Sequence, residues 1–191
     1  MKGRRINKID NSHLNEKITL RKAMLPEGSL RILDAYAGKG TIWKKIGEER
    51  KIEWYTPIEK ERGKNPMAIC GDNEKIIPKL DLSAYNIIDL DAYGMPINLL
   101  LEVLKNETLQ KGTVIFVTCI GYARGTLPHE GARFINATPE MFAKCKLLFH
   151  KKMREMLEGL LSEYGVKEAM LYEHIYDDIG SMHKIYLGFI R

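Results

Sequence analysis

The sequence is poor in cysteine and has no long apolar run. Its three cysteines, Cys70, Cys119 and Cys145, are widely separated and lack metal-ligand spacing. We therefore expect reduced, mostly buried thiols in a cytoplasmic protein rather than a disulfide framework. No apolar run approaches the roughly 18 residues of a membrane span, which argues against a membrane protein. The first residues are basic and polar, and without an apolar core they do not resemble a secretory signal.

Metal-binding spacing is also missing from the histidines of the second half. His129, His150, His174 and His183 form no recognisable ligand pattern, so we expect no metal site. What is present is the composition of a globular protein, with 45% hydrophobic and 29% charged residues. A chain of 191 residues is most simply one domain over residues 1–191, long enough to bury one substantial core.

Positive charge is concentrated in two segments of the chain. The net charge is +5, yet residues 1–30 alone carry +4, residues 121–154 carry +5, and the remainder carries −4. The first of these segments includes a basic helical stretch over residues 1–28. Two basic segments on a mildly acidic body fit a polyanionic partner such as nucleic acid. Ordinary solvated surface charge is the alternative interpretation.

Short β-rich runs alternate with helical patterns along the chain. Strands are expected at residues 30–33, 52–58, 67–70, 85–90, 113–120, 166–175 and 183–190. Helices are expected at residues 13–25, 41–49, 73–80, 97–104 and 138–164. Pro57 weakens the end of its strand or places it at an edge. Alternation through five strands predicts an α/β fold with a parallel sheet between two helical layers, and the short final link adds an antiparallel pair.

A glycine-rich turn follows the first expected strand. Asp34 ends the strand, and Gly38 and Gly40 lie in a Gly-x-Gly turn before a helix. Such glycines let the backbone approach a ligand, and dinucleotide sites use the same feature. Trp43 stands where the third dinucleotide-fingerprint glycine would be, and Asp34 would repel a pyrophosphate. Both details favour S-adenosyl-L-methionine (SAM), which has no phosphates and has an α-amino group, over NAD.

Two acids end the fourth expected strand. Asp89 and Asp91 are followed by Tyr93 and Gly94, and strand alternation directs both carboxylates to the same side. The carboxyl ends of adjacent parallel strands are where open α/β sheets bind ligands. Because burying unpaired charge is costly, we expect these acids to have a role in function.

Residues 33–41, LDAYAGKGT, resemble motif I of class I SAM-dependent methyltransferases, in a variant frequent among RNA and DNA base methyltransferases. The resemblance extends from about residue 30 to the C-terminus. It implies a Rossmann-like seven-stranded sheet in the order 3-2-1-4-5-7-6, with SAM as cofactor. It also implies a ribose contact at Glu59, with Glu61 as the competing choice, and an adenine contact at Asp72, which could equally be a helix cap. The implied cofactor-binding residues are Asp34, Tyr36, Ala37, Gly38, Gly40, Glu59, Asp72 and Asp89.

The segment Asp91-Ala92-Tyr93-Gly94 resembles the motif IV of amino-methyltransferases, and is most similar to that of tRNA guanine-N2 dimethyltransferases. Residues 114–119, VIFVTC, resemble a strand of the same family. The resemblance implies that Asp91, Tyr93 and Asp89 are catalytic. Asp91 would accept the N–H of an exocyclic amine, and Tyr93 would stack on the base. Ala92 replaces the usual proline, and the chain lacks the sizeable C-terminal domain of the tRNA enzymes, which puts tRNA itself in doubt.

The loop after the fifth strand mixes cationic and aromatic residues. Tyr122, Arg124, His129 and Arg133 are the candidate substrate-binding residues, since cations suit phosphates and aromatic rings suit unstacked bases. We therefore expect methyl transfer to an exocyclic amine of a nucleic-acid base, with RNA favoured slightly over DNA. The alternatives are a small-molecule or protein amine under a substrate lid, and an inert SAM-binding or nucleic-acid-binding module.

Overall fold

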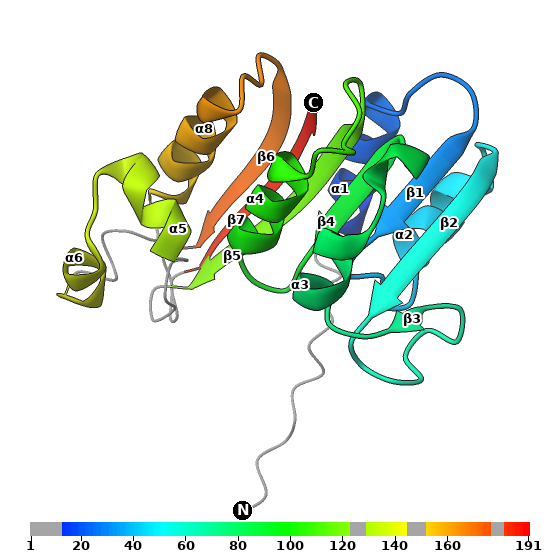
Figure 1. The fold of residues 1–191 in the computed structure, drawn as a ribbon, viewed down its shortest axis with the longest axis horizontal. Coiled ribbons are helices and arrows are strands. Elements are labelled where there is room, and N and C mark those ends of the chain that lie inside the picture. Colours follow the sequence, from blue (N-terminus) through cyan, green and yellow to red (C-terminus); the bar gives the residue numbers. More distant parts are fainter. Residues whose placement is uncertain (1–12, 123–128, 145–151, 177–181) are drawn as a thin grey trace, which may run out of the picture.

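The computed structural model describes residues 13–122, 129–144, 152–176 and 182–191, and its centre is a seven-stranded sheet (Figure 1). The strand order is β3-β2-β1-β4-β5-β7-β6. Every described pair from β3 to β5 is parallel, and β7 is antiparallel to both β5 and β6. This confirms the α/β class and the predicted order. The strands are β1 (Leu30–Asp34), β2 (Ile52–Glu59), β3 (Ile69–Cys70), β4 (Ile87–Asp91), β5 (Val114–Tyr122), β6 (Ala169–Tyr176) and β7 (Met182–Ile190).

Helices cover both faces of the sheet, and an apolar cluster lies under each layer. In Figure 1, α4 (Ile97–Lys105) and α8 (Met153–Glu163) lie in front of the sheet, while α1 (Leu14–Ala23) and α2 (Thr41–Gly47) lie behind it. Buried side chains of α4 and α8 join one core cluster, and those of α1 and α2 join the other. The remaining helices are α3 (Asn73–Ile76), α5 (His129–Ala132) and α6 (Pro139–Lys144), with 3-10 turns at Ile77–Lys79, Leu82–Ala84 and Arg133–Ile135.

The register of the central strands aligns the ends of β1 and β4. Asp34 is the register partner of Asp89 across the β1–β4 pair. One strand further, Asp91 lies opposite Thr118 of β5. At the other side, β2 pairs with the two-residue strand β3, and within the described residues most of β2, Pro57 included, has no strand partner on that side. The acidic residues predicted from two separate motifs therefore end adjacent strands.

The predicted single helix over residues 138–164 is wrong. The structure has α6 at its start and α8 at its end, and α8 has its own N-terminus at Met153. The apolar side chains of α8 are buried in the core, whereas Met141 of α6 is 47% exposed. Residues 145–151 lie outside the described part of the chain. Periodicity detects an apolar stripe without indicating whether a core covers it.

Two smaller expectations also need correction. The helix predicted for residues 73–80 ends at Ile76 and continues as a 3-10 turn containing Pro78, since proline cannot donate the hydrogen bond that a longer α-helix needs. Cys70 is exposed rather than buried, because it lies on the edge strand β3, whereas Cys119 is buried as expected. Cys145 and the link at residues 177–181 lie outside the described residues. Among the described helices, none has the length and apolar character to cross a membrane.

Candidate active site

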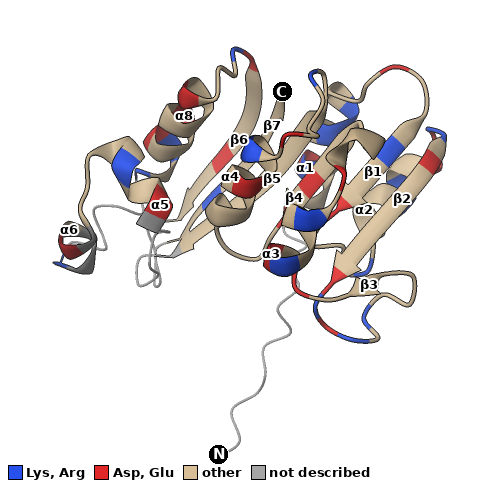
Figure 2. Cartoon of the chain, viewed as in Figure 1, with Lys and Arg blue, Asp and Glu red and all other residues tan. Residues whose placement is uncertain are grey.

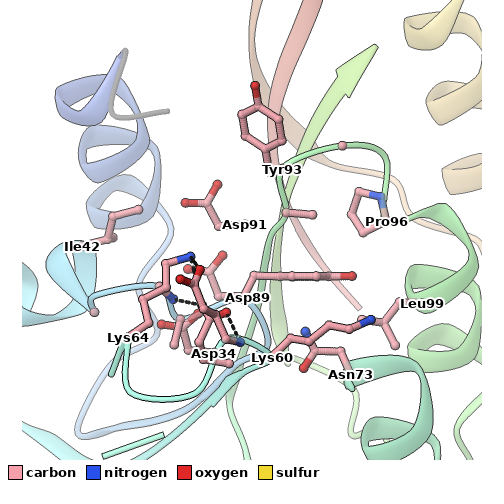
Figure 3. A pocket seen from close by; sticks show the side chains of 18 of the residues that line it. Asp34, Ile42, Lys60, Lys64, Asn73, Asp89, Asp91, Tyr93, Pro96 and Leu99 are labelled. Carbon is pink, nitrogen blue, oxygen red and sulfur yellow. Dashed lines mark hydrogen bonds and ion pairs between the residues drawn. The ribbon is translucent and has the colours of Figure 1, made fainter. Parts of the chain in front are cut away.

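A cavity of about 750 Å³ opens at the carboxyl ends of β1, β2 and β4 (Figure 3). This is the edge at which open α/β sheets bind ligands, and the volume is in the range of small-molecule sites. All the residues predicted to be catalytic or to bind the cofactor line this cavity: Asp34, Tyr36, Ala37, Gly38, Gly40, Glu59, Asp72, Asp89, Asp91 and Tyr93. The fold therefore brings two separate sequence motifs to one site.

The glycine turn adopts a backbone that other residues rarely tolerate. Gly38 and Gly40 have φ angles of 54° and 69°, in the left-handed region. A Cβ atom on Gly40 would lie 3.3 Å from the Tyr55 hydroxyl, so space as well as backbone conformation favours glycine here. The Gly38 N–H donates a hydrogen bond of 3.0 Å to Glu59 Oε2. Glu59 thereby holds the turn against the end of β2.

Asp34 is a buried carboxylate, 4% exposed, at the floor of the cavity. The Tyr55 hydroxyl donates a 2.8 Å hydrogen bond to its Oδ2 atom. Within the described residues, no lysine, arginine or histidine forms an ion pair with it. Burial and the negative charge of Asp89 raise the pKa of Asp34 well above its usual value, although the Tyr55 hydrogen bond acts in the opposite direction. The fold thus keeps an acid here without a cation of its own.

Asp89, by contrast, is held on all sides. Arg21 of α1 donates to both carboxylate oxygens, from Nε at 2.8 Å and from Nη2 at 2.6 Å, and both side chains are 1% exposed. The Trp43 indole adds a third hydrogen bond of 2.8 Å. A bidentate charged pair with no remaining space around it is suited to structure more than to proton transfer. Asp89 lines the cavity, but its geometry is that of a positioning residue.

Asp91 is paired with Lys17, also from α1. The Lys17 ammonium lies 2.7 Å from Asp91 Oδ1, and the Thr118 hydroxyl also hydrogen-bonds to this carboxylate. Burial alone would raise the pKa of Asp91, but attraction to Lys17 and Arg21 and the hydrogen bonds lower it below the usual value. The side chain remains 16% exposed toward the cavity. Figure 3 shows Asp34, Asp89 and Asp91 in succession, with Tyr93 beyond them.

Sequence reasoning did not identify the partners of the buried acids, which are Lys17, Arg21, Trp43 and Tyr55. Lys17 and Arg21 are four residues apart, so one face of α1 presents both cations to the ends of β4. That spacing was visible in the sequence, although nothing in it indicated which acids the cations would meet. Trp43 was read only as a residue incompatible with a dinucleotide site. In the structure it is buried and contributes a donor to Asp89.

The predicted ribose and adenine contacts lie at the other end of the cavity. Glu59 Oε1 accepts the Glu61 N–H at 2.9 Å, and Lys64 lies 3.6 Å from Oε2. Asp72 caps α3 by accepting the Glu74 N–H at 3.3 Å, as its alternative interpretation predicted. Next to it, Asn73 lines the cavity and is buried, and its Oδ1 atom has no hydrogen-bond partner among the described residues. Buried polar atoms are normally satisfied, so an acceptor without a partner at a cavity wall is notable.

Of the predicted acceptor-side residues, Arg133 is the one whose side chain the structure describes, and it does not line the cavity. Arg133 is exposed, stacks 4.5 Å above the Phe134 ring, and pairs with Glu163 of α8 at 2.7 Å. Tyr122 ends β5 and His129 begins α5, while Arg124 lies outside the described residues. On α8 itself, basic and acidic residues are mixed (Figure 2), and both Lys152 and Arg154 form ion pairs with glutamates. These glutamates offset the positive charge of Arg133, Lys152 and Arg154 in the described part of this region.

Comparison with known proteins gives matches in structure only. No protein-family model matches the chain, and no curated protein matches it in sequence. Phosphoethanolamine N-methyltransferase 2 of Haemonchus contortus, in complex with phosphomonomethylethanolamine and S-adenosylhomocysteine, aligns at TM-score 0.58 and 10% identity over 93% of this chain. This chain spans 53% of that protein's length.

Two shorter proteins align over nearly their whole length. A SAM-dependent methyltransferase of Archaeoglobus fulgidus aligns at TM-score 0.54 and 11% identity, over 94% of this chain and 95% of that one. Precorrin-6y C5,15-methyltransferase of Geobacter metallireducens aligns at TM-score 0.53 and 10% identity, over 93% of this chain and 87% of that one. At such low identity the likeness establishes the fold, which is that of SAM-dependent methyltransferases.

Proposed function

We propose that this chain is a SAM-dependent methyltransferase acting on an exocyclic amine of a nucleic-acid base. The observation that carries the proposal is the contrast among the buried acids of the cavity. Asp89 and Asp91 have cationic partners in Arg21 and Lys17, whereas the structure describes none for Asp34. A buried carboxylate without a counter-charge is costly, and a ligand that brings an ammonium group offsets that cost.

The other residues of the cavity suit the remaining parts of SAM. The left-handed turn at Gly38 and Gly40 leaves space beside the backbone, and α2 begins directly after it, where N–H groups favour a carboxylate. Glu59 keeps acceptor capacity for ribose hydroxyls. Near α3, Asp72 and the unsatisfied Oδ1 atom of Asn73 are acceptors available to an amino group of adenine. When bound, SAM supplies a methyl group on a positively charged sulfur.

Asp91 and Tyr93 suit the handling of a planar amine. The lowered pKa of Asp91 keeps it ionised, so it can accept an N–H hydrogen bond from the amine and direct the nitrogen lone pair away from itself. Because the amine nitrogen becomes positively charged once it is methylated, it then releases a proton, which the ionised Asp91 carboxylate can accept. Tyr93 is 51% exposed at the cavity, where its ring can stack against a base.

A small-molecule amine is the second candidate, and the pairing of surface charges favours it. Arg133, Lys152 and Arg154 all form ion pairs with glutamates, which reduces the positive potential that a nucleic acid would meet. The two candidates differ in their response to salt. Binding of a nucleic acid weakens steeply as salt increases, because cation–phosphate contacts release counterions. Binding of a small neutral amine changes little over the same range.

A labelled-methyl assay tests the proposal. The purified chain is incubated with methyl-labelled SAM and, separately, with total RNA, denatured DNA and a panel of small amines, at several salt concentrations. Label in RNA or DNA that falls steeply with salt, and is lost in Asp91→Ala, supports the proposal. Label in a small amine alone supports the second candidate. SAM binding without transfer to any acceptor in the panel would overturn the enzymatic assignment and indicate a binding module.

A further inference from the structure

We propose that His13, Glu16 and His174 form a binding site for one divalent transition-metal ion of the zinc type. His13 and Glu16 lie at the start of α1, and His174 lies on β6, 161 residues further along the chain than His13. One nitrogen of each histidine and one carboxylate oxygen lie within 4.8 Å of one another. No local spacing in the sequence indicates this trio, because His174 lies far from His13 and Glu16 along the chain. The proposal is independent of the methyltransferase assignment.

The distances within the trio are close to those of a metal site. His174 Nε2 lies 2.6 Å from Glu16 Oε2, and His13 Nδ1 lies 3.3 Å from Glu16 Oε1. Nitrogen and oxygen ligands bind Zn²⁺ at about 2.0–2.2 Å, which places tetrahedral ligand atoms about 3.3 Å apart. The ligand atoms of the trio lie within 4.8 Å of one another, so side-chain rotations that bring them to about 3.3 Å would convert the hydrogen-bonded trio into a ligand set. The side chains are 23%, 36% and 26% exposed, in chain order, which leaves the fourth position open to water.

The surroundings of His13 match those of a metal ligand. Its Nε2 atom lies 2.6 Å from the Tyr176 hydroxyl, so the ring can donate from Nε2 while Nδ1 faces Glu16. Metal-binding histidines commonly donate their second ring N–H in this way, which fixes the ring and its tautomer. The His13 and His174 rings are stacked with centroids 3.9 Å apart. His13 also has a positive φ of 61°, a conformation that is uncommon without glycine and is retained where surrounding contacts enforce it.

The ligand set selects the class of metal. Two imidazoles and one carboxylate suit zinc, copper, nickel or cobalt, whereas magnesium and calcium prefer oxygen ligands with more negative charge. The neighbourhood includes cations, since Lys17 lies 5.2 Å from the Tyr186 ring centroid and Lys184 lies 5.7 Å from that of Tyr176. A site with one carboxylate and nearby ammonium groups therefore favours a metal that binds neutral nitrogen.

The position of the trio gives the ion a mechanical consequence. The Lys17 N–H donates a hydrogen bond of 3.1 Å to the His13 carbonyl, so His13, Glu16 and Lys17 belong to the same first turn of α1. A metal joining His13 and Glu16 to His174 would fasten this turn to β6. Because Lys17 contacts Asp91, the ion would stiffen one wall of the cavity without touching a ligand in it.

Calorimetric titration of the untagged chain with Zn²⁺ tests this site, with Mg²⁺ as the comparison ion. We expect one Zn²⁺ per chain at micromolar affinity or tighter, and no Mg²⁺ binding. His13→Ala, His174→Ala and Glu16→Gln should each weaken Zn²⁺ binding at least tenfold. Tyr176→Phe, which removes only the outer hydrogen bond, should weaken it about 10-fold or more. Thermal unfolding with and without Zn²⁺ checks that each variant folds and whether the ion still stabilises it.

Two control variants separate the trio from nonspecific binding. His129→Ala removes a histidine that is not part of the trio, and Glu49→Gln removes an acid that pairs with Lys22 at the other end of α1. Both should bind Zn²⁺ as the unaltered chain does. The proposal is overturned if the unaltered chain binds Zn²⁺ no more tightly than millimolar, or if folded trio variants bind it as well as the controls do.

Discussion

The carboxyl ends of β1 and β4 carry acids in the same register but in opposite electrostatic settings. At the end of β1, Asp34 has only the neutral Tyr55 hydroxyl as a described side-chain partner, and its pKa is raised. At the end of β4, Asp89 is enclosed by Arg21 and Trp43. Asp91, two residues further along the same strand, is paired with Lys17 and has a lowered pKa.

The difference lies in the counter-charges: the folded chain supplies a cation to Asp89 and to Asp91, and the structure describes none for Asp34. The acids of β4 receive their counter-charges from α1, which packs across the sheet behind them. No helix brings a cation to Asp34 within the part of the chain that the structure describes. A buried acid tends to neutralise itself by binding a proton or by binding a cation. We infer that the end of β1 is built for a cationic ligand, and the end of β4 for chemistry beside it.

The largest expected effect follows from removing the acid that faces the acceptor. Asp91→Ala should lower turnover about 10²–10⁴-fold, because it removes the group that positions the amine and accepts its proton. Affinity for SAM should stay within a few-fold of the original value. Steady-state assays combined with calorimetry measure both quantities. Unchanged turnover in a folded variant would remove Asp91 from the mechanism.

The second-largest effect concerns the buried ion pair between Arg21 and Asp89 at the end of β4. Arg21→Ala should lower the free energy of unfolding by about 3–5 kcal/mol, because it leaves the buried charge of Asp89 without compensation. Lys22→Ala, which breaks an exposed ion pair one residue along the same helix, should cost no more than about 1 kcal/mol. Urea unfolding of both variants gives the comparison. Equal losses would mean that Arg21 does not hold a buried charge.

The smallest effect is a difference in how stability depends on pH at Asp34, at the end of β1, and at Asp91, at the end of β4, measured without ligand. The raised pKa of Asp34 means that its contribution to stability is present below about pH 4 and is lost as the pH rises through the folded-state value. Asp34→Asn should therefore gain stability relative to the unaltered chain as the pH rises. The lowered pKa of Asp91 gives the opposite sign, with a contribution present above about pH 4 and lost as the pH falls below it.

Asp91→Asn should consequently be less stable than the unaltered chain at neutral pH, and the gap should close in acid. Urea unfolding from about pH 2 to about pH 8, which spans the range where each contribution is lost, follows both variants. The quantity to compare is the difference in unfolding free energy between each variant and the unaltered chain, plotted against pH. If this difference changes with pH in the same direction for Asp34→Asn and Asp91→Asn, the ends of β1 and β4 are not electrostatically different.

Much of the fold could be predicted from the sequence because strand and helix periods are local properties. The strand β5 is almost continuously apolar, the apolar residues of β4 are buried, and the glycine turn after Asp34 marks a sharp change of direction. The predicted helix over residues 138–164 failed because α8 has its own N-terminus at Met153. Apolar spacing alone does not show where one helix ends and another begins.

The lining of the cavity was predictable where a residue belongs to one of the two motifs or lies at or just after a strand end, as Glu59 and Asp72 do. Asp34 with its glycines, and Asp91 with Tyr93, are contiguous in sequence and lie together in the structure. The partners of the acids were not predictable, because Lys17 and Arg21 reach β4 from 74 and 68 residues away. Such pairs depend on how α1 docks on the sheet. The His13–His174 contact was hidden for the same reason.

The most direct test of the central claim is calorimetric binding of SAM to Asp34→Asn and to Asp81→Asn, whose substitution lies at an exposed helix cap. The comparison ligand is 5′-methylthioadenosine, which keeps the adenosine part but lacks the amino-acid group. We predict that Asp34→Asn weakens SAM binding at least tenfold and leaves 5′-methylthioadenosine binding unchanged, while Asp81→Asn alters neither. If Asp34→Asn binds SAM as tightly as the unaltered chain does, Asp34 does not hold the cationic end of a cofactor.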